Sequence, residues 1–350
     1  PSACAREYHN CRPKSHYALT FIMDHRMGAF HNRLKDCNLL QKTIEETLQM
    51  KHIIQGIHSA VATPVTKDGT PDLRLLSEHC RSLLKEGCHG IALLGSTGEA
   101  NSFGLKDRIT ILEAAINCTN APEAFLPGTS TPAIADTIEL TRHAVSVGSK
   151  GVVLLPPYYY KGVSDEGIFR YYSGLIEGIG DDRLRVVLYH IPQISQIPIS
   201  FDLIDRLMKA YPDIIVGIKD SSGKLENLRN LCKRHPKLAV LTGSDPLMLP
   251  LLQMGGAGCI TATSNLCAEE LRVIWDNWGR VNTAGKLKAS QDKIVKWRTL
   301  SKKYDQLATI KTMLAERYQE DGWLHMVPPL VELQPLQQQI VWSEMKRLDP

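Results

Sequence analysis

Lys219 is the residue whose sequence surroundings most clearly suggest chemistry. It follows the apolar part of "IIVGIKDSSG" (214–223), so a charged side chain ends a run of strand-favouring residues. Burial in apolar surroundings lowers the pKa of a lysine, and a neutral amine adds to ketones to give a Schiff base. The run therefore predicts either a Schiff-base lysine or a lysine paired with a carboxylate, such as that of neighbouring Asp220.

Two other segments carry groups that would serve a keto acid. "GSTGE" (95–99) adds the hydroxyls of Ser96 and Thr97 to glycines that let a ligand approach the backbone, and N–H groups leading into a helix bind carboxylates. This segment is either a carboxylate cradle or a small-residue turn without a ligand. "YHIP" (189–192) ends another apolar run, and its Tyr189 is either a proton carrier or a core tyrosine with one hydrogen bond.

Three further segments give weaker signals. "PPYYYKG" (156–162) contains three consecutive tyrosines, which also suit an aromatic packing patch. Asp245 in "GSD" (243–245) either binds substrate hydroxyls or caps a helix. "GGAG" (255–258) precedes its apolar run, so we interpret it as a tight turn and not as a phosphate loop.

The apolar pattern indicates the fold that positions these segments. Amphipathic helical patterns, such as "PDLRLLSEHCRSLLKEG" (71–87), alternate with short apolar runs that end in Gly, Pro, Ser or Asp. Eight such units favour a closed (β/α)8 barrel of parallel strands, an α/β fold, over an open sheet. The runs cover residues 53–65, 90–96, 124–130, 151–157, 184–192, 214–220, 238–245 and 257–265.

The same pattern predicts three regions: an irregular N-terminal extension (1–49), the barrel (50–266) and a small C-terminal helical subdomain (267–350). Active sites of such barrels lie at the carboxyl ends of the strands. We therefore expect "GSTGE", Tyr189 and Lys219 to meet there. A carboxylate cradle, a phenol and a lysine in apolar surroundings are the groups needed for reactions next to the ketone of a keto acid.

Composition excludes several other classes. The chain is 43% hydrophobic and 22% charged with a net charge of +4, and no lysine–arginine block suggests nucleic acid. We find no run of 18 apolar residues that would span a membrane, and no Cys/His spacing that would hold a metal. The nine scattered cysteines favour reduced thiols of a cytoplasmic protein.

Over roughly residues 52–345 the chain resembles the dihydrodipicolinate synthase / N-acetylneuraminate lyase family of pyruvate-dependent class I aldolases. The motifs that carry the resemblance are "GSTGE", "YHIP", "GIKDSSG", "ATPVTKDGTPD" (62–72) and "PPYYYKG". The resemblance implies a (β/α)8 barrel, no cofactor, pyruvate and an aldehyde or sugar acid as small-molecule partners, and a homotetramer built as a dimer of dimers.

The resemblance also implies roles for individual residues. Lys219 forms the imine with pyruvate C2, and Tyr189 relays protons. Tyr159 is the tyrosine lent across a subunit interface, unless Tyr158 or Tyr160 holds that place. The residues implied to bind the keto acid are Ser96 and Thr97, through its carboxylate, and Ile260, through a backbone carbonyl.

Departures from the family pattern suggest the substrate. Dihydrodipicolinate synthases have an arginine for a second carboxylate where this chain has Ile194. The serine of "GSTGE" and Asp245 are closer to sialic acid and keto-deoxy sugar acid lyases. We therefore expect cleavage of a 2-keto-3-deoxy sugar acid or 4-hydroxy-2-keto acid to pyruvate and an aldehyde. The alternatives are dihydrodipicolinate synthase and a non-catalytic keto-acid-binding relative.

His190 is an unusual residue for its position in the family pattern. Its side chain is either structural or reaches the pocket.

Overall fold

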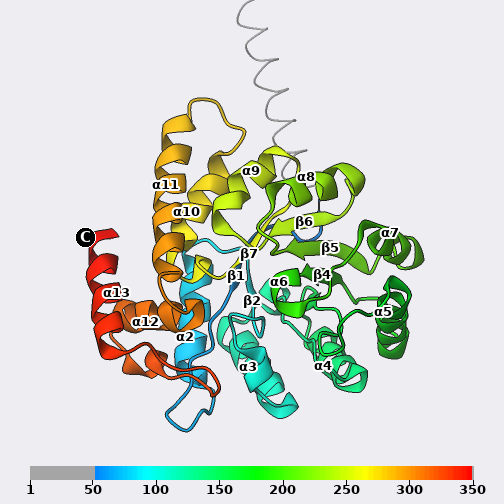
Figure 1. Cartoon of the computed structure of the whole chain (residues 1–350), viewed down its shortest axis with the longest axis horizontal. Helices are drawn as coiled ribbons and strands as arrows, with labels where there is room; N and C mark the ends of the chain where they lie inside the picture. The colour runs from blue at the N-terminus through cyan, green and yellow to red at the C-terminus, as the bar shows by residue number, and fades with distance from the viewer. Residues whose placement is uncertain (1–51, 349–350) are drawn as a thin grey trace, which may run out of the picture. The chain divides into compact units, whose positions relative to one another are not determined.

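The computed structural model describes residues 52–348, so the predicted extension over residues 1–49 lies outside the described residues. Within them, seven strands pair in parallel in the order β2-β1-β7-β6-β5-β4-β3 (Figure 1). The strands are β1 (Gly56–Ala60), β2 (Gly90–Ala92), β3 (Val152–Leu154), β4 (Val186–His190), β5 (Ile215–Asp220), β6 (Ala239–Thr242) and β7 (Gly258–Thr261).

The apolar run at 124–130 fills the gap between β2 and β3 without forming a regular strand. It makes single parallel bridges, from Phe125 to Ile91 of β2 and from Gly128 to Val153 of β3. On the β2 side the N–H groups of Leu126 and Gly128 donate to the carbonyls of Ile91 and Leu93, whereas on the β3 side Pro127 has no N–H to donate, which limits pairing there. The predicted barrel is therefore confirmed, with seven regular strands and one extended segment in place of eight strands.

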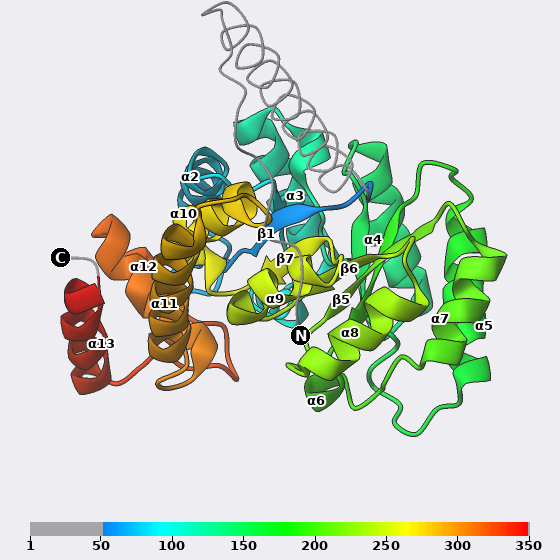
Figure 2. The ribbon, with the colours of Figure 1, turned by 90° about the horizontal axis from the view of Figure 1, so that it is seen from above.

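Helices alternate with the strands and surround them (Figures 1 and 2). Helical patterns in the sequence predicted six of them, at residues 71–87, 107–119, 133–148, 166–179, 200–212 and 225–236. The side chains of Asp72, Ser164 and Ser200 cap three of these helices at their N-termini. The helices are α2 (Leu73–Lys85), α3 (Leu105–Thr119), α4 (Ile134–Ser146), α5 (Asp165–Ile179), α6 (Pro192–Ser195), α7 (Phe201–Ala210), α8 (Leu225–Arg234), α9 (Met248–Gln253) and α10 (Ser264–Asn277).

Three helices follow α10, and Figure 2 shows them gathered on the α10 side of the barrel. They are α11 (Ala284–Ser301), α12 (Gln306–Tyr318) and α13 (Pro335–Leu348). The predicted boundary at residue 266 falls within α10, and the division into barrel and subdomain stays a prediction. None of the helices between residues 52 and 348 is long and apolar enough to cross a membrane.

Strand alternation sorts side chains into two apolar layers. Leu188 of β4 packs in the layer between strands and helices, whereas Val187 and Tyr189 pack inside the barrel. His190 therefore points outward, where its Nδ1 accepts a hydrogen bond from the Ile199 backbone N–H at 3.2 Å. This contact supports the structural interpretation of His190.

Candidate active site

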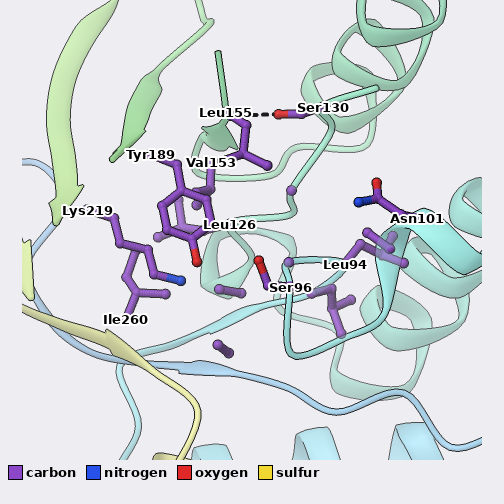
Figure 3. A pocket seen from close by; sticks show the side chains of 16 residues that line it. Leu94, Ser96, Asn101, Leu126, Ser130, Val153, Leu155, Tyr189, Lys219 and Ile260 are labelled. Atoms are coloured by element: carbon purple, nitrogen blue, oxygen red, sulfur yellow. Dashed lines mark hydrogen bonds between the residues drawn. The ribbon is translucent and has the colours of Figure 1, made fainter. Parts of the chain in front are cut away.

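Lys219 and Tyr189 are neighbours inside the barrel. They occupy paired positions on β5 and β4, and each is only 5% exposed. The Lys219 Nζ lies 4.2 Å from the centre of the Tyr189 ring. Figure 3 shows the amine, the phenol and the hydroxyl of Ser96 pointing into one space. The structure thus brings together three groups that lie far apart in the sequence.

The "GSTGE" loop after β2 is held in an uncommon backbone conformation. Leu94, just before it, and Glu99, its last residue, have φ values of 55° and 52°, in the left-handed region that non-glycine residues rarely adopt. A side chain at Gly98 would place its Cβ 2.8 Å from the Val61 carbonyl oxygen. Glycine at this position lets the loop pack against the segment that directly follows β1, which fixes Ser96 at the cavity.

Two hollows meet at the same four residues, Ser96, Tyr189, Lys219 and Ile260. The inner cavity has about 490 Å³ of empty space and the outer cleft about 1630 Å³, both counting space open to solvent. The inner cavity is lined mainly by small and apolar residues of the barrel. The outer cleft also contains Thr97 and polar residues after β4, β5 and β6, so its size and lining suit a substrate longer than pyruvate.

The surroundings of Tyr189 favour its ionised form. Burial alone would raise the pKa of its phenol. The nearby charge of Lys219, and hydrogen bonds with Ser96, Ser221 and Lys219, act in the opposite direction and together outweigh burial. The pKa of Tyr189 therefore lies below its ordinary value of 10.0, which suits a phenol that accepts protons during turnover.

This electrostatic balance can be measured. We expect the Ser221→Ala variant to raise the pKa of Tyr189, because it loses one hydrogen bond that favours the phenolate. The measurement is an ultraviolet titration of phenolate absorbance, with the curve of Tyr189→Phe subtracted to isolate Tyr189. Ser222→Ala changes the next serine of the same cleft and serves as the control. A Tyr189 titration that is identical in Ser221→Ala and wild type would show that the Ser221 hydroxyl does not lower the pKa of Tyr189.

Behind the loop, Glu99 and Lys311 form a buried ion pair. The Lys311 Nζ on α12 lies 2.5 Å from the Glu99 Oε1, and the side chains are 1% and 0% exposed. The same Nζ donates a hydrogen bond to the His325 carbonyl at 2.8 Å. Burial lowers the pKa of Lys311, and the Glu99 carboxylate opposes that shift. The pair ties the loop that carries Ser96 to a C-terminal helix.

Removing one partner of this pair should destabilise the fold. Lys311→Met leaves the Glu99 carboxylate buried without its partner, at an expected cost of about 3–5 kcal/mol in the free energy of unfolding. Urea denaturation gives this value. The double variant Glu99→Gln/Lys311→Met removes both charges and should recover part of the loss. If the double variant is no more stable than Lys311→Met alone, the unpaired charge is not the cause.

Asp245 and the three consecutive tyrosines at 158–160 do not lie beside Lys219 and Tyr189. Asp245 is fully buried and is not among the described residues that line either hollow; its Oδ2 lies 3.4 Å from the Arg298 Nη1. Tyr159 and Tyr160 are each 71% exposed and stack edge to face. Tyr158 donates a hydrogen bond to Asn101, which lines the inner cavity, at 2.7 Å.

Sequence reasoning missed most polar residues of the outer cleft, among them Ser221, Arg298 and Lys302. Ser221 follows β5 two residues after Lys219, so its place at a strand end was a usable signal. Arg298 and Lys302 belong to a segment whose sequence indicates only a helix, and no motif marks them. Among residues 52–348, no group of three or more His, Cys, Asp or Glu side chains is placed to hold a metal ion.

A barrel with a buried lysine and tyrosine at the carboxyl ends of adjacent strands defines an aldolase-like class of protein. The model of the Dihydrodipicolinate synthetase family matches residues 53–347, and the chain belongs to this family. Members of the family are lyases of the class I aldolase type, and the chain is therefore an enzyme of this kind. The predicted resemblance is confirmed.

Individual relatives carry two kinds of name. A protein of Chloroflexus aurantiacus called "Uncharacterized DapA-like lyase" is 38% identical over 63% of this chain and 74% of its own length. A "4-hydroxy-tetrahydrodipicolinate synthase" of Corynebacterium urealyticum is 34% identical over 65% of this chain and 73% of its own. The names alone do not choose between a general lyase and the synthase.

Solved structures share the fold. The dihydrodipicolinate synthase of Agrobacterium tumefaciens is 29% identical with a TM-score of 0.77, over 85% of this chain and 100% of that one. YagE, a prophage protein of E. coli K12 that belongs to the dihydrodipicolinic acid synthase family and was solved in complex with pyruvate, is 26% identical with a TM-score of 0.76. It covers 84% of this chain and 98% of its own.

Proposed function

We propose that Lys219 forms a Schiff base with the ketone of a keto acid and that the enzyme cleaves this acid to pyruvate and an aldehyde. The observation that carries the proposal is the contact between Lys219 and Tyr189, whose Nζ-to-ring distance is 4.2 Å, where the inner cavity meets the outer cleft. The hydroxyls of Ser96 and Thr97 bind the carboxylate of the keto acid, and the backbone carbonyl of Ile260 faces it.

The steps follow from the chemistry of an imine. The neutral amine of Lys219 bonds to C2 of the keto acid, Tyr189 donates a proton, and the C2 oxygen leaves as water, which gives a protonated imine and a Tyr189 phenolate. The C3–C4 bond then breaks: its electron pair forms an enamine, the proton of the C4 hydroxyl goes to Tyr189, and an aldehyde departs. Tyr189 returns a proton to C3, and water hydrolyses the pyruvate imine to release pyruvate and the amine.

The outer cleft supports a hydroxylated substrate. Besides Lys219, it is lined by the uncharged polar side chains of Gln193, Ser222 and Ser244, which suit hydroxyl groups. Ile194, at the position where the family's synthases have an arginine, also lines the cleft and is 63% exposed. These residues favour a 2-keto-3-deoxy sugar acid or 4-hydroxy-2-keto acid.

Trapping tests the proposal directly. Incubation with pyruvate and borohydride should reduce the imine to a stable amine, detected as a mass adduct on the peptide that contains Lys219. Pyruvate release from a panel of 2-keto-3-deoxy and 4-hydroxy-2-keto acids then identifies the substrate. Absence of an adduct would contradict an imine mechanism and favour the non-catalytic keto-acid-binding alternative.

A second candidate is 4-hydroxy-tetrahydrodipicolinate synthase, and the observation that favours it is the Corynebacterium urealyticum relative of that name. Pyruvate and aspartate semialdehyde test it. If the semialdehyde is consumed with a higher kcat/KM than any acid of the cleavage panel, the synthase is the correct function. The trapped adduct on Lys219 is common to both candidates, so the panel and not the trapping decides between them.

We also propose a cytoplasmic homotetramer in which Tyr159 joins the proton relay of a neighbouring subunit. The support is the 71% exposure of Tyr159 and Tyr160 in the single chain, an unusual environment for two adjacent large side chains. Light scattering measures the assembly. Mixing Lys219→Met and Tyr159→Phe subunits would restore partial activity if the tyrosine serves a neighbouring subunit's site.

A further inference from the structure

The lining of the outer cleft includes two positively charged side chains. Arg298 and Lys302 lie four residues apart at the end of α11 and line the same cleft as Lys219. The side chain of Arg298 is 17% exposed, and Lys302 is exposed. The residues considered so far explain how a keto acid and hydroxyl groups would bind, but they assign no role to these two cations.

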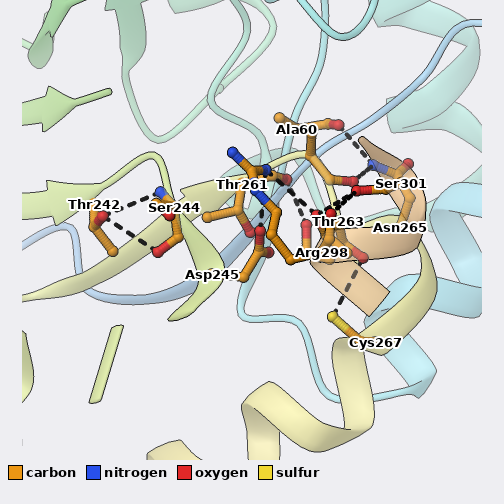
Figure 4. Close-up of polar contacts among 12 residues, drawn as sticks. Ala60, Thr242, Ser244, Asp245, Thr261, Thr263, Asn265, Cys267, Arg298 and Ser301 are labelled. Carbon is orange, nitrogen blue, oxygen red and sulfur yellow. Dashed lines mark hydrogen bonds and ion pairs between the residues drawn. The ribbon is translucent and has the colours of Figure 1, made fainter. Parts of the chain in front are cut away.

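Arg298 is held in place from behind (Figure 4). Its Nη1 lies 3.4 Å from both the Asp245 Oδ2 and the Thr263 Oγ1. Asp245 is fully buried, so its carboxylate fixes the guanidinium from the protein side. Both contacts use the same nitrogen, and a guanidinium carries five N–H donors. The other N–H donors of Arg298 thus remain for a group in the cleft. Asp245 is a positioning residue that acts by orienting Arg298.

The charges of Arg298 and Lys302 repel each other. The guanidinium of Arg298 is the main reason why the pKa of Lys302 lies below its ordinary value; partial burial adds to the shift and Asp245 opposes it. Like charges placed this close favour an anion between or beside them, because the anion relieves their repulsion. A guanidinium with an ammonium is also a suitable pair for the oxygens of a carboxylate or phosphate.

The nearby carboxylate of Asp305 does not cancel the positive charge of Arg298 and Lys302. Asp305 also lines the cleft, but its Oδ1 accepts hydrogen bonds from the backbone N–H groups of Leu307 and Ala308, both at 3.1 Å. Its charge therefore interacts with the positive end of α12. The carbonyl end of α11 disfavours an anion by itself, and the side chains of Arg298 and Lys302 must outweigh that effect.

We propose that Arg298 and Lys302 bind a terminal anionic group, a carboxylate or a phosphate, on the aldehyde half of the substrate. The inference rests on the proposed function, because it assumes that the keto acid half is attached to Lys219 in the same cleft. The uncharged polar side chains of Gln193, Ser222 and Ser244 line the same cleft. This arrangement lets a chain with Ile194 recognise a charged tail through α11.

A matched substrate series tests the proposal. The three compounds are a six-carbon 2-keto-3-deoxy aldonic acid that ends in a hydroxymethyl group, the acid of the same chain that ends in a carboxylate, and the 6-phosphate ester. We expect at least one anionic substrate to have a kcat/KM about ten- to a hundredfold above the hydroxymethyl compound. The preferred anion identifies the group. Equal values for all three would overturn the proposal.

Substitutions on α11 test whether Arg298 and Lys302 cause the preference for an anionic substrate. Lys302→Met and Arg298→Lys should each reduce the preference by raising the KM of the anionic substrate more than the KM of the hydroxymethyl substrate. Arg298→Lys keeps a cation beside Asp245, so the fold is retained, but it removes the planar array of guanidinium N–H donors. Lys296→Met removes the same charge from α11 outside the outer cleft and is the control. A preference that survives in both variants would contradict the assignment.

A binding measurement separates this inference from the proposed function. Glycerol, glycerate and glycerol 3-phosphate mimic the aldehyde half with neutral, carboxylate and phosphate ends, and they do not react with an amine. Calorimetry should show tighter binding of one anionic compound, weakened in Lys302→Met and not in Lys296→Met. Equal binding of all three overturns the anion site even when pyruvate is trapped on Lys219; an anion preference supports the site even when trapping fails.

Discussion

Lys219→Met is expected to lower kcat/KM on the order of 10⁴-fold or more, because it removes the nucleophile on which every later step depends. Methionine has a similar length, no charge and no reactive amine, so it fits an apolar environment in which the wild-type side chain is 5% exposed. We therefore expect the variant to fold at least as stably as the wild type. The measurements are pyruvate release and urea denaturation.

The control for this prediction is Lys224→Met. Lys224 lies five residues further along the chain, is exposed and is not among the described residues that line the two hollows. Its variant should retain both turnover and the borohydride adduct on Lys219. Substantial pyruvate release by Lys219→Met, beyond the level of the uncatalysed reaction, would show that the amine is not the nucleophile.

Tyr189→Phe should keep the fold and lower kcat about 10²- to 10⁴-fold, the range that a positioned proton-transfer group contributes. The ring that packs beside the Lys219 Nζ remains, and only the hydroxyl is lost. The imine can still form, more slowly, because Lys219 is intact. Single-turnover kinetics and the rate of adduct formation with pyruvate and borohydride measure the two effects separately.

A second buried tyrosine provides the matched control for Tyr189→Phe. Tyr172 on α5 is fully buried, and its hydroxyl donates a hydrogen bond to the Leu154 carbonyl at 3.2 Å outside the two hollows. Tyr172→Phe should cost about 1 kcal/mol of stability and leave kcat unchanged. Equal losses of turnover in both variants would point to a general effect of removing a buried hydroxyl.

The sequence predicted the barrel and the centre of the site because both depend on local patterns. Apolar strands alternate with amphipathic helices, and strand ends carry the chemistry, so the meeting of Ser96, Tyr189 and Lys219 followed from their places in the chain. The extended segment around Pro127 was counted as a strand because an apolar run does not show how many ladder hydrogen bonds it makes.

Other parts of the site depend on tertiary placement. Asp245 was correctly placed after a strand, but the direction of its side chain depends on Arg298, 53 residues further along the chain. Arg298 and Lys302 contribute to the cleft only because α11 packs against α10 and against the short helical turn Asp245–Leu247 that follows β6. Their sequence pattern is that of any charged helix, and only the packing of that helix shows which of its cations face the substrate.

The ion pair between Glu99 and Lys311 has a consequence for the modularity of the enzyme. A protein cut near residue 266 would keep every strand of the barrel, yet it would leave Glu99 buried without its countercharge. The barrel is therefore not a self-sufficient unit that protein engineers could excise or recombine. During biosynthesis, likewise, the loop with Ser96 can reach its final form only after the ribosome has translated Lys311.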